Sequence, residues 1–350
     1  MSAPRLRAGF EVELLAPPGA SRRDLAEDLA RRRGGSVRPF FHVDTEGSAV
    51  PGVDAFWHLT PGFRVLDAAG EPVCSLVDDT SVVADLDARA RPRPGWYRVV
   101  SDDARLLRLV ARHADPAAGI GSVLGPVAAL FGTPVQQLGA VHRVDDAAGA
   151  TIAMAAPLPG ERERVCEVIT PPVEAGHEEV LEALLAPARA LGFSVPREAA
   201  VHVHLDAAPF RDPGRFAAVV RSFGGRRREL HERFGTNPHC RRLAPLPAEL
   251  VELCARRWPD WESLRAAAAR TPVTKFCDLN VTRVLGLRPG PDTLEVRILP
   301  GALDGASIAA RLADLEDLLA APGQPCAGVP GGPSGGVPGA CGAGAGRSTR

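Results

Sequence analysis

Four short segments of the sequence alternate apolar residues with residues that carry charge or can bind a cation. They read FEVE from Phe10, CEVI from Cys166, HVHLD from His202 and LEVRI from Leu294. Because side chains two residues apart in a β-strand point to the same face of a sheet, each segment predicts a strand with one apolar and one polar face. Such alternation usually marks a solvated face, but here the polar faces carry carboxylates, imidazoles and a guanidinium.

Other patterns predict the elements around these strands. Helices are predicted over 21–33, 101–115, 121–131, 177–192, 212–235, 248–270 and 304–319, and a hairpin over 141–157. Short strands between Gly/Pro turns are predicted at 36–44, 55–60, 63–67, 73–79 and 81–88, with later strands at 275–285 and 293–301. Because the strands cluster in hairpins with long helices between them, we predict an α+β fold with a mostly antiparallel sheet.

Composition defines the domain organisation. Residues 321–350 are rich in Gly, Pro and Ala and contain no aromatic residue. Such a segment cannot bury enough surface to offset the entropy of ordering it, so we predict a disordered tail. No comparable linker interrupts the rest of the sequence, which predicts one large domain over residues 1–320.

Several protein classes are disfavoured. The net charge of −1 gives no long-range attraction to nucleic acid. No apolar run reaches the ~20 residues that a membrane span needs, and the N-terminus lacks a secretory apolar core. The seven cysteines form no C-x-x-C pair, which predicts reduced thiols in the cytoplasm and argues against a zinc–thiolate site.

If the four strands adjoin, their carboxylates repel one another by several kcal/mol at low effective dielectric, and the cluster calls for two divalent cations. Carboxylate-rich sites suit Mg²⁺ or Mn²⁺, and Mg²⁺ at such sites typically works with substrate phosphates. Arg297 lies two residues from Glu295 and shares its face, so it can contact a phosphate. This pattern predicts phosphoryl chemistry, whereas no P-loop and no G-x-G-x-x-G motif is present.

A second interpretation of the same residues is a metal-dependent hydrolase or oxygenase. His202 and His204 form an H-x-H pair that could hold zinc or iron with a distant glutamate. Asp78 and Asp79 are also open to two interpretations, because they could orient an amine substrate or form an Asx turn.

Five motifs in one order resemble the amidoligase family, whose relatives are glutamine synthetase and glutamate–cysteine ligase in the carboxylate–amine ligase superfamily. The motifs are GFEVE, CEVITPPV, AVHVHLDA, RFGTNPHCRRL and KFCDLNV…TLEVRILPG, and they span about residues 9–301. The resemblance implies a glutamine synthetase-like catalytic domain over residues 1–320. A curved antiparallel sheet, with helices on its outer face, would surround an ATP site with two cations.

The resemblance also implies roles for the residues of the four strands. Glu11, His202 and Glu295 would bind one cation, and Glu13 and Glu167 the other. Among the same residues, Glu13 and Glu295 are expected to take part in catalysis.

Further residues are expected to contact the nucleotide or the substrates. Arg297 would contact the transferred phosphoryl group, and His204 would lie on the nucleotide side. Arg233 and Asn280 would contact a substrate carboxylate or a phosphate. Lys275, the only lysine of the chain, would contact a phosphate or acyl group or lie on the surface.

The sequence departs from the family in two places. Glutamine synthetases use a further glutamate shortly after the one matching Glu167, and here VITPPV follows. The second cation is then expected to be held more weakly, or to use Asp206 or water. Residues 87–163 are longer than the corresponding segment of the family, and we expect a substrate lid or an elaboration of the fold.

The implied reaction joins a carboxylate to an amine, each from a small molecule or a peptide. ATP phosphorylates the carboxylate to an acyl phosphate, the amine attacks, and phosphate leaves, because phosphate is a far better leaving group than oxide. The resemblance leaves two alternatives open. One is a non-catalytic relative that binds nucleotide, and the other is a phosphotransferase.

Overall fold

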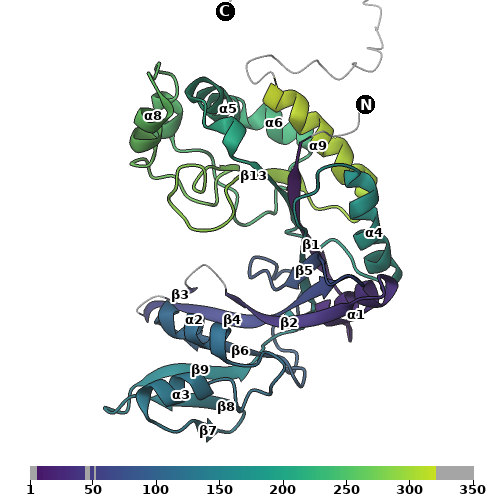
Figure 1. Cartoon of the computed structure of the whole chain (residues 1–350), viewed down its shortest axis with the longest axis vertical. Helices are drawn as coiled ribbons and strands as arrows, with labels where there is room; N and C mark the ends of the chain where they lie inside the picture. The colour runs from purple at the N-terminus through teal and green to yellow at the C-terminus, as the bar shows by residue number, and fades with distance from the viewer. Residues whose placement is uncertain (1–5, 44–47, 51–52, 321–350) are drawn as a thin grey trace, which may run out of the picture.

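The strands form one open, antiparallel sheet. The computed structural model describes residues 6–43, 48–50 and 53–320. Within them the thirteen-stranded sheet has the order β12–β13–β11–β1–β10–β5–β4–β6–β9–β8–β7, while β2 and β3 pair with β4 (Figure 1). The strands are β1 Ala8–Leu15, β2 Ser36–Val43, β3 Ser48–Val50, β4 Val53–Leu66, β5 Pro72–Val77, β6 Tyr97–Ser101, β7 Gln136–Leu138, β8 Val141–Asp145, β9 Thr151–Pro157, β10 Val165–Ile169, β11 Ala200–Asp206, β12 Leu279–Asn280 and β13 Thr293–Pro300.

The helices lie mainly between the strands that carry the four alternating segments. They are α1 Arg22–Arg32, α2 Ala104–His113, α3 Gly125–Phe131, α4 His177–Ala190, α5 Pro213–Gly225, α6 Arg227–Phe234, α7 Ala248–Leu253, α8 Trp261–Ala268 and α9 Gly305–Ala320. Short 3₁₀ helices cover Arg162–Arg164 and Ala208–Phe210. No helix of this described part of the chain has the length and apolar character that crossing a membrane requires.

The four alternating segments lie on neighbouring strands, in the order β13, β11, β1 and β10. All three pairings between them are antiparallel, and their register brings polar residues together. Glu13 lies opposite Glu167, Glu11 opposite His202, and Glu295 opposite His204. The pleat then presents these side chains on one face of the sheet.

The opposite face of these strands packs against helices. Phe10, Val12 and Leu14 of β1 are at most 1% exposed and belong to the main hydrophobic core. The same core contains helical side chains from α1, α4 and α9, among them Leu25, Leu29, Leu181, Leu185, Ile308 and Leu312. Figure 1 shows α1, α4 and α9 along one side of the sheet. Burial of the apolar face therefore fixes which way the polar face points.

A second hydrophobic core lies at the other end of the sheet. It joins side chains of α2, α3 and strands β6, β8 and β9 to residues of β2 and β4, and includes Leu59, Leu107 and Val144. Much of the segment 87–163 thus continues the main sheet and packs around a core of its own.

Most predicted elements are confirmed, including the hairpin of β8 and β9, and three strand predictions are wrong. Segments 55–60 and 63–67 are parts of the single strand β4. Residues 81–88 form turns, because the Asp79 carboxylate accepts the Ser81 amide at 2.8 Å and Glu198 accepts the Ala84 amide at 2.8 Å. Of 275–285 only β12 is a strand, and the Asn280 side chain then accepts the Thr282 amide, which starts a turn. The predicted tail, 321–350, lies outside the described residues.

Arg22 links helix α1 to three other parts of the fold. Its guanidinium is fully buried and donates to the carbonyl of Pro61 at 3.0 and 3.1 Å, and to those of Arg162 at 2.8 Å and Val165 at 3.1 Å. It also lies 4.6 Å from the centre of the Trp96 ring. The buried carbonyls have a charged donor in place of water, and burial lowers the pKa of Arg22 although nearby Asp78 opposes this shift.

We expect Arg22→Ala to destabilise the protein by about 3 kcal/mol or more, because it leaves buried carbonyls unpaired and opens a cavity. Urea unfolding followed by circular dichroism measures this change. The neighbouring, exposed Arg23 provides the matched control, and Arg23→Ala should cost about 1 kcal/mol or less. Equal effects of the two substitutions would contradict the linking role of Arg22.

Candidate active site

The polar face of the four strands lines a cavity of about 490 Å³. Its walls include five residues predicted to form the site: Glu11, Glu13, Glu167, His202 and Glu295. Glu13, His202 and Glu295 are only 3–4% exposed. The structure therefore brings together side chains that lie up to 284 residues apart in the sequence (295 − 11).

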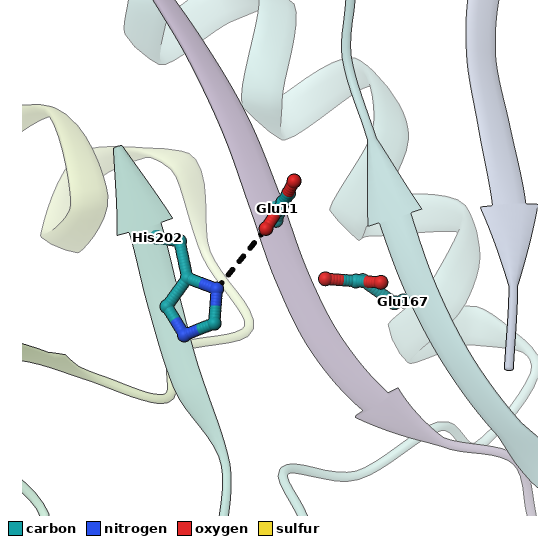
Figure 2. A group of neighbouring side chains, drawn as sticks. All are labelled: Glu11, Glu167 and His202. Carbon is teal, nitrogen blue, oxygen red and sulfur yellow. Dashed lines mark hydrogen bonds and ion pairs between the residues drawn. The ribbon is translucent and has the colours of Figure 1, made fainter. Parts of the chain in front are cut away.

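One group of possible metal ligands consists of Glu11, Glu167 and His202. Each offers an atom within 4.8 Å of the others. Figure 2 shows them on three adjacent strands, with Nδ1 of His202 3.1 Å from Oε2 of Glu11. The other ring nitrogen, Nε2, lies 3.6 Å from Oε1 of Glu13 and makes no hydrogen bond within the described residues. A buried imidazole nitrogen without a hydrogen bond, next to a carboxylate, is a position that a cation can fill.

A second group consists of Glu11, His204 and Glu295, with ligand atoms again within 4.8 Å. Nε2 of His204 is 3.0 Å from Oε1 of Glu11, and Nδ1 is 3.3 Å from the Thr293 hydroxyl. His204 joins this group because the β11–β13 register sets it beside Glu295. The expected set of Glu11, His202 and Glu295 is also close together, since Nδ1 of His202 lies 3.7 Å from Oε1 of Glu295.

The buried carboxylates have opposite pKa shifts. Burial, and then the negative charge of Asp79, raises the pKa of Glu13 well above its usual value. Burial and the charge of Glu11 do the same for Glu167. Burial alone would raise the pKa of Glu11 and Glu295, but the histidines lower it for Glu11, and Arg297 with His204 lowers it for Glu295. A bound cation would favour the ionised form of Glu13 and Glu167 and so oppose this rise in their pKa.

Three further residues lie around the acidic side chains, and all three were expected to contact the nucleotide or a substrate. Arg297 forms an ion pair with Glu295, and the pKa of its guanidinium is raised because this pairing outweighs burial. Asn280 donates to Oε2 of Glu295 at 2.6 Å, so it holds that carboxylate in place. Lys275 lines the cavity, and its ammonium lies 5.4 Å from the centre of the Phe276 ring.

Arg233 does not join the site, although it was expected to contact a substrate. It lies on α6, and its guanidinium donates to the carbonyl of Asp314 in α9 at 3.3 Å. The helix ends at Gly235, a left-handed cap, and the chain then turns so that Arg242 of the same motif lines the cavity. Arg242 was missed because the motif contains several arginines and the sequence does not show where the helix ends.

The two aspartates after β5 have separate roles. Asp78 pairs with Arg162 at 2.5 Å. Asp79 forms an Asx turn with Ser81, with its Oδ1 accepting the Ser81 amide at 2.8 Å, and it also lines the cavity near Glu13. Burial alone would raise the pKa of Asp79, but the hydrogen bonds from Ser81 lower it. Asp79 therefore adds negative charge to the cluster from a loop, where no strand periodicity could reveal it.

The geometry agrees with the comparison with protein families. The model of the family described as "Putative amidoligase enzyme" matches residues 4–313. The chain belongs to this family, as the five sequence motifs predicted. Searches of curated proteins and of solved structures found no match.

We expect Glu167→Gln to stabilise the cation-free protein at about pH 8 and to have less effect at about pH 5. The raised pKa means that folded Glu167 holds a proton more tightly than unfolded Glu167, so stability is lost as pH rises through the folded pKa. The glutamine has no such loss. In EDTA the melting temperature should rise by about 2–4 °C, the shift that ~1 kcal/mol produces.

Differential scanning fluorimetry at both pH values provides the measurement. Glu252→Gln, at an exposed glutamate of α7, controls for the loss of one charge. A gain that is the same at both pH values would contradict the argument from ionisation.

Proposed function

We propose that the protein is an ATP-dependent carboxylate–amine ligase with a glutamine synthetase-like catalytic domain. The observation that carries the proposal is the convergence of Glu11, Glu13, Glu167, His202 and Glu295 on one sheet face in a chain of the amidoligase family. The reaction would phosphorylate a carboxylate with ATP and then replace phosphate by an amine.

The ligand set fits divalent cations. Its atoms are mainly hard carboxylate oxygens, which favours Mg²⁺ or Mn²⁺. Glu11 would serve both groups, with Glu167 and His202 in one and His204 and Glu295 in the other. Bound cations of this kind neutralise nucleotide phosphate oxygens and the charge on a transferred phosphoryl group.

The residues of the chain itself would bind and orient the reacting groups. Arg297, 12% exposed and paired with Glu295, can donate to a phosphoryl oxygen while that carboxylate keeps it in position. Asn280 fixes the other oxygen of Glu295. Further basic side chains line the cavity and can bind the nucleotide phosphates or the substrate carboxylate: Arg108, Arg242, Lys275, Arg283 and Arg288.

The arrangement of the histidines favours the ligase over the hydrolase or oxygenase. A metal centre of the H-x-H type uses both imidazoles on one ion. In the described residues, His202 and His204 fall in separate groups, each with two carboxylates. Carboxylate oxygens then outnumber nitrogens in each group, which suits Mg²⁺ better than zinc or iron.

We expect the protein with ATP and Mg²⁺ to release ADP and phosphate only when an acid and an amine are both present. A panel of acids and amines with a coupled assay for ADP, and mass spectrometry for a product lighter by one water, tests this. Glu295→Gln should lower turnover by about 100-fold or more, because it removes a cation ligand and the partner of Arg297.

The matched control for turnover is Glu252→Gln, which should leave activity unchanged. Nucleotide binding without turnover across the panel would favour a non-catalytic relative. Phosphoryl transfer to a guanidino compound without amide formation would favour a phosphotransferase, and tightly bound zinc or iron without ATP affinity would favour the hydrolase or oxygenase.

A further inference from the structure

A smaller cavity adjoins the acidic one. It has a volume of about 200 Å³ and shares the lining residues His42, Asp78 and Thr80 with the larger cavity. The typical range for a site that encloses a whole small molecule is roughly 300–1,000 Å³. The side cavity therefore has room for one part of a ligand whose remainder lies among the carboxylates.

The side cavity contains more positive than negative charge. Arg98 of β6 and Arg162 line it, and Asp78 is its one carboxylate among the described residues. Asp78 is already paired with Arg162 at 2.5 Å. Among the residues that the structure describes, the charge of Arg98 is thus left without a carboxylate of its own.

Arg98 has a buried hydrogen-bond donor without an acceptor. Its Nε atom is inaccessible to solvent and makes no hydrogen bond within the described part of the chain. Burial, with the nearby charge of Arg162, lowers the pKa of the guanidinium. An unpartnered buried donor lowers stability, and a bound anion would remove that cost.

The remaining walls of the side cavity suit a small organic anion. His58 and Thr60 of β4 are 9% and 6% exposed and line the cavity with side chains that can form hydrogen bonds. Leu158 and Pro159 form an apolar wall. A carboxylate at the end of a short carbon chain matches this combination, because the charged end meets Arg98 and the chain meets the apolar wall.

We propose that the side cavity binds a substrate carboxylate that does not react. This inference rests on the proposed ligase function, because that function puts the reacting groups in the adjoining acidic cavity. There, the basic side chains are assigned to the nucleotide phosphates and to the reacting carboxylate, so a second, unreactive carboxylate needs a cationic position of its own. The substrate class is then a dicarboxylic acid, or an α-amino acid or peptide that supplies the amine and keeps its own carboxylate.

Direct binding tests the side cavity without requiring turnover. Glutarate and alanine are each titrated into the full chain with Mg²⁺ by isothermal titration calorimetry, up to about 50 mM. We expect at least one probe to bind, and Arg98→Met to weaken its binding by about 30-fold or more, as loss of a buried charge pair does. The affinity of Arg98→Lys for the probe should lie between those of the wild type and Arg98→Met, since lysine keeps the charge but lacks the planar guanidinium that can donate two parallel hydrogen bonds.

The control is Arg112→Met, which removes the same charge from an exposed position of α2 and should bind the probes like the wild type. Melting temperatures of all variants without ligand show whether each is folded. ATP turnover then shows whether the unreactive carboxylate belongs to the acid substrate or to the amine substrate. Glutarate with methylamine tests a dicarboxylic acid, and acetate with alanine tests an amino-acid amine.

Equal binding to the wild type and Arg98→Met would overturn the proposal, as would no binding of either probe to the wild type. Arg98-dependent binding of inorganic phosphate, but of neither carboxylate, would also overturn it. Arg98-dependent carboxylate binding without ATP turnover on any panel would refute the ligase function and leave the carboxylate site standing. ATP turnover that is the same in the wild type and in Arg98→Met would refute the carboxylate site and leave the ligase function standing.

Discussion

The candidate site depends on the pairing register of four antiparallel strands. In each strand the apolar side chains pack into the main hydrophobic core, to which helices α1, α4 and α9 contribute, so the polar side chains are forced onto the other face. A shift of one residue in any strand would place its polar side chains in the hydrophobic core. The same hydrophobic burial that stabilises the sheet therefore fixes the positions of Glu11, Glu167, His202 and Glu295.

The cluster lowers stability, and the chain limits this cost in two ways. Some carboxylates receive positive partners, as Glu295 does from Arg297 and Glu11 from the two histidines. For others, burial raises the pKa, as it does for Glu13 and Glu167, so that protonation removes their charge more readily than it would in water. Both solutions keep the possible ligand atoms together, which is the preorganisation that the proposed phosphoryl transfer would need.

Local periodicity was enough to predict most of the strands and helices, and the site residues that lie on strands. It could not show that the four strands adjoin, since strand order is a long-range property, and the family resemblance supplied that step. Residues outside regular alternation were harder to predict. The sequence left two interpretations open for Asp79, and it did not single out Arg242, which reaches the cavity from a loop. Arg22 is a charged helix residue whose burial no pattern reveals, and Arg98 is one of many arginines in the chain.

Strand β4 belongs to both hydrophobic cores. Its 14 residues place Phe63 and Val65 in the main core and Leu59 in the second. The side cavity lies beside this strand, whereas the proposed cation ligands lie on β1, β10, β11 and β13. After gene duplication, a copy can therefore change what the side cavity recognises through mutations in β4, β6 and the residues that follow β9, while the strands that carry the proposed cation site stay untouched. The architecture separates evolution of selectivity from evolution of the reaction.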